Sequence, residues 1–293
     1  MTERRSDMHQ EFIDLYREYN EGLFNRRDFF NRLVVLSGST VAAFSLVSQL
    51  ENKAATAEII KKDDARLHTE TVLYPGQTGD VRAYWARLKG KEELPAVIVI
   101  HENRGLNDHI KDVTRRMALE GFLAIAPDAL SPLGGTPEDS NEARSRLREL
   151  DYQDTIKNFV AAVQYLKTHP LSTGKVGCTG FCWGGGMTNQ VAVHSSDLSA
   201  AVPYYGSQPA AEDVPRIKAS LLLHYAGLDK RINAGIKAFE AALKKESKDY
   251  KIYIYEGAGH AFNNDTNESR YHKEAAQLAW KRTIAFFKAK LKT

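Results

Sequence analysis

The chain has 293 residues, of which 43% are hydrophobic and 26% are charged, and its formal net charge is +3. This size permits one large α/β domain or two small ones. The small net charge, without a basic stripe interleaved with aromatic residues, argues against a nucleic-acid-binding protein. The two cysteines, Cys178 and Cys182, have a C-x-x-x-C spacing with no second pair. Neither a disulfide framework nor a zinc site is therefore expected.

Residues 1–57 differ in composition from the rest of the chain. The pair Arg26-Arg27 precedes an uncharged stretch over 33–50, and Ala55-Thr56-Ala57 has the small-residue pattern of a cleavage site. Together these features resemble a twin-arginine export signal, so we predict export to the periplasm. The long acidic leader before Arg26, and Asp28 inside the motif, favour an alternative in which a helical N-terminal extension stays on a cytoplasmic protein. A membrane-spanning helix is not expected, because Ser and Gly interrupt the apolar stretch.

Residues 58–293 are predicted to form one domain. Short apolar runs alternate with segments of helical periodicity, which is typical of parallel strands covered on both faces by helices. We therefore predict an α/β fold with a doubly wound, mostly parallel sheet. Strands are expected over 69–73, 80–88, 95–100, 121–127, 174–179, 198–205, 220–225 and 250–255, the first two as an edge hairpin around Pro75-Gly76. Helices are expected over 11–24, 106–120, 142–169 with one break, 187–194, 233–247 and 266–291.

The stretch Gly180-Phe181-Cys182-Trp183-Gly184 lies between a predicted strand and a predicted helix. A Gly-x-nucleophile-x-Gly turn in this position is a nucleophile elbow, because only glycine neighbours let strand and helix approach closely. A cysteine at its apex would be activated at a helix N-terminus. The alternative is a glycine-rich turn with a structural cysteine. Cys178 is predicted to be a small core residue.

An activated cysteine needs a base, and the base needs an orienting group. Asp229 and His260 each follow a predicted strand, in the chain order acid then histidine that is typical of α/β hydrolases. If only one of them were present, Asp229 or His260 would more often be a structural turn or loop residue than a catalytic one. Backbone N–H groups of Trp183 and Asn103 are candidate oxyanion donors. Glu102 beside Asn103 could instead be an ion-pair or helix-terminus residue.

Taken together, these motifs resemble the dienelactone hydrolase family. The matching residues are G-F-C-W-G-G around Cys182, Asp229, G-x-G-H-A-F around His260, Glu102-x-x-Gly105-x-Asn107, and Tyr204-Tyr205-Gly206. The resemblance implies an α/β-hydrolase fold, a Cys182-His260-Asp229 triad working through an acyl-enzyme, and hydrolysis of a dienelactone to maleylacetate. It also implies that Glu102 contacts and helps to activate the resting cysteine, that Tyr205 belongs to the substrate site, and that no metal or cofactor is needed.

The sequence departs from the family in the residues that hold the substrate carboxylate. Family members use two arginines, one shortly after a Pro-Asp pair and one four residues after the catalytic histidine. Here the first region reads Pro127-Asp128-Ala129-Leu130-Ser131, and the second position is Asn264. Arg104 and Arg231 are possible substitutes. We therefore predict hydrolysis of a small-molecule ester or lactone, with a non-catalytic ligand- or partner-binding protein and a thiol redox protein as the alternatives.

Overall fold

The computed structural model describes residues 11–12, 14–16, 18–19, 26–40, 43, 59–90 and 93–292. The chain divides into two compact units, one formed by residues 1–57 with 266–269 and the other by 58–265 with 270–293. In the first unit, helix α2 (Arg26–Ser37) buries Phe29 and Leu33 among aromatic residues, and the ring centroids of Tyr19 and Phe29 are 4.5 Å apart. No helix in the described ranges has the length and apolar character needed to cross a membrane. The expected cleavage site at 55–57 lies outside the described residues.

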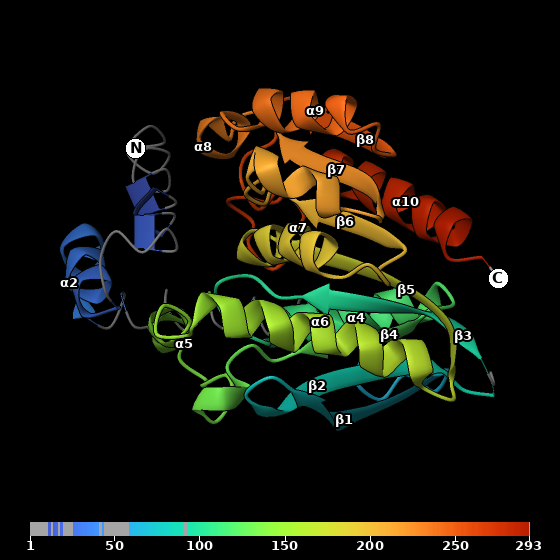
Figure 1. Ribbon diagram of the computed structural model, residues 1–293. Helices are drawn as coiled ribbons and strands as arrows, with labels where there is room; N and C mark the ends of the chain where they lie inside the picture. The colour runs from blue at the N-terminus through green and yellow to red at the C-terminus, as the bar shows by residue number, and fades with distance from the viewer. Residues whose placement is uncertain are drawn as a thin grey trace. The chain divides into compact units, whose positions relative to one another are not determined.

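The second unit is built on one eight-stranded sheet (Figure 1), with strand order β1-β2-β4-β3-β5-β6-β7-β8. Strands β3 to β8 run parallel, and β2 is antiparallel to both β1 and β4. This confirms the predicted α/β class and places the expected hairpin at an edge of the sheet. The strands are β1 (Leu67–Gly76), β2 (Gly79–Leu88), β3 (Leu94–Ile100), β4 (Leu123–Pro127), β5 (Ser172–Phe181), β6 (Ala200–Tyr204), β7 (Ser220–Ala226) and β8 (Tyr250–Tyr255).

Helices cover both faces of this sheet (Figure 1). Alternate residues of β3 divide between the two cores: Ile98 and Ile100 pack in the core with α6 and α7, whereas Val97 and Val99 pack in the core with α4 and α10. A strand that is buried on both faces has a continuous run of apolar residues, and for this reason β3 could be predicted from the sequence. The helices are α4 (Asp108–Leu119), α5 (Ser140–Arg146), α6 (Tyr152–Thr168), α7 (Trp183–His194), α8 (Lys230–Asn233), α9 (Ile236–Lys245) and α10 (Lys273–Lys290), with 3-10 turns η1 (Ser131–Leu133) and η2 (Ala211–Arg216).

Several predicted boundaries were wrong. The last helix begins at Lys273 rather than Thr266, because the His272 side chain accepts from the N–H of Ala275 and caps it. The helix predicted over 233–247 is divided into α8 and α9 at Gly235. The hairpin turns at residues 77 and 78 rather than at Pro75-Gly76. Helix α7 begins at Trp183, immediately after the elbow cysteine, and not at Met187.

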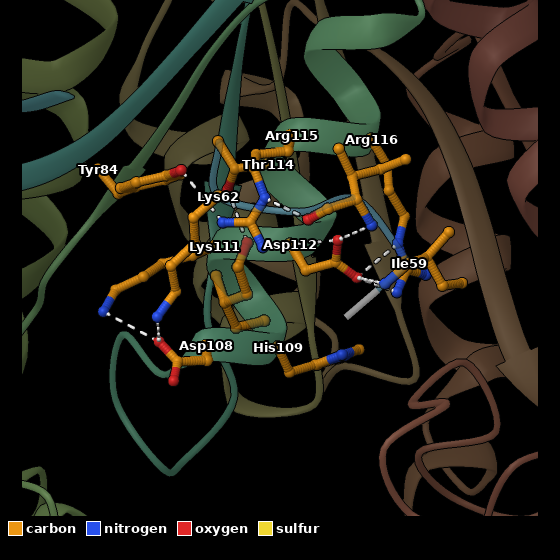
Figure 2. Close-up of polar contacts among 12 residues, drawn as sticks. Ile59, Lys62, Tyr84, Asp108, His109, Lys111, Asp112, Thr114, Arg115 and Arg116 are labelled. Carbon is orange, nitrogen blue, oxygen red and sulfur yellow. Dashed lines mark hydrogen bonds and ion pairs between the residues drawn. The ribbon is translucent and has the colours of Figure 1, made fainter. Parts of the chain in front are cut away.

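Polar side chains of α4 fasten the beginning of this unit (Figure 2). The Asp112 carboxylate accepts hydrogen bonds from the backbone N–H groups of Ile59 (3.1 Å) and Ile60 (2.8 Å). Arg115 Nε donates to the Ile60 carbonyl at 2.7 Å. Arg116 bonds Asp112 through Nε at 2.9 Å and Asp265 through Nη1 at 2.6 Å. Helix α4 therefore links the first described residues of the unit to the loop that follows β8.

Candidate active site

The candidate site lies where β3, β5, β7 and β8 end. Because these strands are parallel, their carboxyl ends meet at one edge of the sheet, where α/β proteins place their sites. Ile100 pairs with Gly180, and Ala226 pairs with Tyr255. The loops after β3 and β5 therefore leave the sheet side by side, as do the loops after β7 and β8, with β6 between the two pairs.

Cys182 occupies a strained turn between β5 and α7. Its backbone angles are φ 55° and ψ −113°, and its N–H donates to the Tyr204 carbonyl at 3.1 Å. A Cβ at Gly180 would lie 2.3 Å from the carbonyl oxygen of Gly184, and a Cβ at Gly184 would lie 2.4 Å from that of His101. Both positions therefore require glycine. The expected elbow is present, with a half-buried thiol at its apex.

Three side chains from separate loops form a hydrogen-bonded chain. His260 Nε2 lies 3.0 Å from Cys182 Sγ, and His260 Nδ1 lies 2.5 Å from Asp229 Oδ2. Asp229 Oδ1 also accepts from the Ile232 N–H at 3.2 Å, so this carboxylate caps α8 as well. The order Asp229, His260, Cys182 is the one expected from the sequence.

The pKa values of this chain of groups are displaced in opposite directions. Burial lowers the pKa of His260, but its hydrogen bonds to Asp229 and Cys182 prevail and raise that pKa to about 9. Burial raises the pKa of Asp229, but its hydrogen bond to His260 prevails and lowers it below its usual value. An ionised Asp229 and a protonated His260 therefore stabilise each other.

The backbone N–H groups of Asn103 and Trp183 are the candidate oxyanion donors. A Cβ at Gly184 would collide with the carbonyls of Ile100 and His101, so the backbone at the end of β3 passes close to the elbow. Within the described ranges, neither the N–H of Asn103 nor that of Trp183 has a hydrogen-bond acceptor. Donors without an acceptor are what an oxyanion site requires, so both N–H groups remain candidates for that role.

Glu102 and Tyr205 also lie at this edge of the sheet. The buried carboxylate of Glu102 accepts a 2.7 Å hydrogen bond from Asn264 Nδ2. Tyr205 is fully buried at φ 37°, and its ring centroid lies 5.2 Å from that of His260. Burial, followed by the charges of Glu102 and Cys182, raises the pKa of Tyr205 well above its usual value. The hydroxyl of Tyr205 is therefore neutral.

The two candidate substitutes for the arginine clamp are placed differently. Arg104 extends toward α5, where its Nη1 donates to Ser140 Oγ (3.0 Å) and Asn141 Oδ1 (2.8 Å). Arg231 is exposed on α8, and its charge contributes to the lowered pKa of Asp229. The sequence did not identify Arg144 of α5, whose charge interacts with Cys182 and whose pKa is lowered mainly by burial. The sequence also did not predict the hydrogen bond between Asn264 and Glu102.

Cys178 has surroundings unlike those of Cys182. It is fully buried, its Sγ lies 3.7 Å from Thr188 Oγ1, and burial raises the pKa of its thiol to about 12. A core role, as predicted from the sequence, accounts for these properties. In the described part of the chain, no group of three or more His, Cys, Asp or Glu side chains is arranged to hold a metal ion.

Comparisons with known proteins agree with this geometry. The chain is 33% identical over 246 residues to the Escherichia coli O157:H7 protein named "Putative carboxymethylenebutenolidase", covering 78% of this chain and 90% of the relative. It is 38% identical over 205 residues to protein usf of Aquifex pyrophilus, covering 66% and 87%. The solved structure of a dienelactone hydrolase-like promiscuous phosphotriesterase, P91, from metagenomic libraries superposes with a TM-score of 0.70 at 26% identity, covering 78% of this chain and all of that one.

The fold is that of the α/β hydrolases. Residues 81–291 match the model of the dienelactone hydrolase family, and the chain belongs to this family. It is accordingly a hydrolase that acts on ester or lactone bonds.

Proposed function

We propose that the protein hydrolyses its substrate through a cysteine nucleophile and an acyl-enzyme. The observation that supports this most directly is the hydrogen-bonded chain from Cys182 Sγ through His260 to Asp229, with separations of 3.0 and 2.5 Å. The thiolate is the nucleophilic form of cysteine, and an adjacent imidazolium favours it. Asp229 holds the imidazole in the required tautomer and orientation.

The proposed reaction has two steps. The Cys182 sulfur attacks the carbonyl carbon, and the N–H groups of Asn103 and Trp183 stabilise the charge that develops on the carbonyl oxygen. His260 gives its proton to the departing alkoxide, which leaves a thioester on Cys182. Water then attacks the thioester while His260 takes its proton, and the acid product departs from a restored thiolate–imidazolium pair. We assign Glu102, held by Asn264, to activation of the resting cysteine.

Substitution of Cys182 tests this proposal. Cys182→Ala should reduce kcat for a p-nitrophenyl ester by several orders of magnitude, because removal of a nucleophile disables the residues that act with it. Cys178→Ser is the matched control, since it alters the other thiol four residues away, and it should keep most of the activity. Activity of Cys182→Ala within tenfold of wild type, in a protein with a normal thermal melt, would refute the proposal.

We further propose that neutral esters or lactones are accepted as well as anionic ones. Asn264 is bonded to Glu102, and Arg104 is bonded to α5, so neither provides the two-arginine clamp of the family. Each charge-assisted contact contributes about 1.5–3 kcal/mol, so loss of two lowers discrimination by two or more powers of ten.

The test compares kcat/KM for a carboxylated dienelactone and a neutral lactone of similar size. We expect a preference for the anionic substrate below about a hundredfold, which corresponds to about 2.7 kcal/mol. A larger preference that disappears in Arg144→Gln would contradict the proposal and identify Arg144 as a replacement cation. Arg231→Gln is the control, because Arg231 is exposed on α8.

A further inference from the structure

His101 is a fully buried histidine between β3 and Glu102 that the proposed reaction does not use. The Ala129 N–H, from the loop after β4, donates to His101 Nε2 at 3.2 Å. Nε2 therefore carries a lone pair, and the ring hydrogen resides on Nδ1. Nδ1 lies 2.7 Å from the carbonyl oxygen of Glu102, to which it donates. Burial lowers the pKa of His101, which favours this neutral tautomer.

The hydrogen bond from Nδ1 determines the direction of another group. The Glu102 carbonyl and the Asn103 N–H belong to the same peptide unit, which is planar and trans, so the two bonds point in opposite directions. A carbonyl held by His101 therefore holds the Asn103 N–H pointing away from the ring. In the part of the chain that the structure describes, no acceptor occupies that N–H.

The same ring also contacts the other half of the candidate oxyanion site. The His101 ring stacks on the indole of Trp183, with ring centroids 5.3 Å apart and planes 12° apart. Trp183 carries the second candidate N–H donor, and a Cβ on the next residue, Gly184, would lie 2.4 Å from the His101 carbonyl oxygen. The imidazole of His101 therefore contacts the carbonyl of the Glu102–Asn103 peptide and the side chain of Trp183, the two residue positions that supply the candidate donors.

His101 is not placed to transfer protons in the reaction. Both ring nitrogens are occupied, Nε2 by Ala129 and Nδ1 by Glu102, and the side chain has no exposed surface. A proton relay needs a ring nitrogen within reach of the substrate or of water. A role in orienting the neighbouring peptides accounts for the contacts of the ring.

We propose that His101 is a positioning residue of the oxyanion site. As the neutral Nδ1–H tautomer, it locks the Glu102–Asn103 peptide so that the Asn103 N–H points to the oxyanion, and its ring packs against the side chain of Trp183, the residue with the other donor. The proposal rests on the proposed cysteine mechanism. Catalysis depends on such donors being oriented before the reaction, because reorienting them would add to the barrier.

Three substitutions separate the contacts of the ring. His101→Asn places an amide N–H close to the position of Nδ1, so it can still hold the Glu102 carbonyl. His101→Gln places its amide close to Nε2, where it meets Ala129 and leaves the Glu102 carbonyl without its donor. His101→Phe keeps an aromatic ring against Trp183 but removes both hydrogen bonds.

The measurements are kcat and KM for a neutral p-nitrophenyl ester, and the rate of Cys182 alkylation by iodoacetamide. Loss of one oxyanion donor lowers kcat by about 10²–10³, and a misdirected donor should cost about 10- to 100-fold. We expect that loss in His101→Gln and His101→Phe, with KM within about threefold of wild type, and a kcat within about tenfold of wild type in His101→Asn. Alkylation forms no oxyanion, so its rate should remain within about threefold of wild type in every soluble variant.

Three results would overturn the proposal: a wild-type kcat in His101→Gln or His101→Phe, a His101→Asn that is no better than His101→Gln, or a parallel fall of kcat and the alkylation rate. If His101→Phe does not fold, the comparison of His101→Asn with His101→Gln still tests the proposal. Cys182→Ala is assayed alongside. If Cys182→Ala remains active, the cysteine mechanism fails. If it is inactive while the His101 variants are unaffected, only the role of His101 fails.

Discussion

At the scale of single residues, backbone strain is concentrated around the candidate site. Among the described residues, four non-glycine residues have a positive φ, and three of them are Cys182, Tyr205 and Ala261. Ala261 follows His260, and Tyr205 packs against its ring. Strained backbone persists where the surrounding structure enforces it, and it collects at functional sites. The strain therefore marks the loops that carry Cys182 and His260, and the loop of Tyr205 that packs against His260.

A second buried histidine, His224 of β7, belongs to the structure rather than to the site. Arg282 donates to the Tyr255 hydroxyl at 3.2 Å, and that hydroxyl lies 2.9 Å from His224 Nδ1. His224 Nε2 lies 3.1 Å from Thr283 Oγ1. Burial, followed by the charge of Arg282, lowers the pKa of His224 to about 3.

This histidine should make the fold sensitive to acid. The unfolded chain protonates His224 near pH 6.5 and the folded chain only near pH 3, so the unfolded state binds more protons between these values. The free energy of unfolding therefore decreases as the pH falls from about 6.5 toward 3. Urea titrations should give a steeper pH dependence for wild type than for His224→Asn, by up to about 1.4 kcal/mol per pH unit. Equal slopes in the two proteins would contradict this account.

At the scale of elements, close backbone contact positions the elbow. A Cβ at Gly184 would lie 2.4–2.5 Å from the carbonyl oxygens of His101 and Ile100, which are backbone atoms that cannot move independently. A Cβ at Gly186 would lie 2.7 Å from the Ser207 hydroxyl, which can rotate away, and the nearest backbone atom, Ser207 N, would be 3.7 Å away. Helix α7 therefore has no room for a side chain at Gly184, but it can accommodate a small one at Gly186.

Gly184→Ala should lower activity by more than about a hundredfold and destabilise the fold by about 1–3 kcal/mol, as overpacking does. Gly186→Ala is the matched control, and it should be neutral or stabilising by up to about 1 kcal/mol, because alanine favours a helix. Thermal melts and an ester assay measure both effects. A Gly184→Ala protein that is as active and stable as Gly186→Ala would contradict the close contact.

The loop that carries His260 is fastened to α4 by an ion pair. Arg116 Nη1 bonds Asp265 Oδ2 at 2.6 Å, and both side chains are mostly buried. Asp265→Ala leaves Arg116 without this partner and should destabilise the fold by about 2–4 kcal/mol, with a lower kcat. Glu120→Ala breaks the exposed pair with Lys288 and should cost less than about 1 kcal/mol. Equal losses in urea denaturation would mean that the pair does not fasten the loop.

The elements differ in how far the sequence predicted them. The sequence predicted the bounds of strands such as β3 and β8 almost to the residue. Burial of one or both faces of a strand requires an alternating or a continuous apolar pattern, which can be recognised in the sequence. The start of α7 was missed, because Gly184, Gly185 and Gly186 have poor helix propensity and the tertiary contacts of the elbow override it. The three-residue chain at the site was foreseen from motif order. The pair Glu102–Asn264 was not, because it depends on two loops 162 positions apart in the chain.

At the scale of the whole molecule, both the match to the family and the backbone contacts made by helix α4 lie in the second unit. The match covers residues 81–291, and Asp112 and Arg115 hold the backbone of Ile59 and Ile60. Ile59 and Ile60, the first described residues of this unit, follow closely on the expected cleavage site. Processing there would leave these anchoring contacts in place.

We predict that the mature protein begins near Glu58 and lies outside the cytoplasm. The reason is the combination of Arg26-Arg27, the uncharged stretch and Ala55-Thr56-Ala57. Mass spectrometry of the protein from fractions of its native host measures the N-terminus, and replacement of both arginines by lysine should keep the protein inside. A full-length N-terminus in the soluble cytoplasmic fraction would show that the extension is retained.

The central claim is that Cys182 carries the acyl group during turnover. The most direct measurement is mass spectrometry of the enzyme quenched with acid within the first turnovers of p-nitrophenyl acetate. The account predicts one added acetyl group, on the peptide that contains Cys182, and its accumulation when deacylation is slowed by His260→Ala. Turnover with no adduct on Cys182 under these conditions, or an adduct on another residue that forms and decays at the rate of turnover, would contradict it.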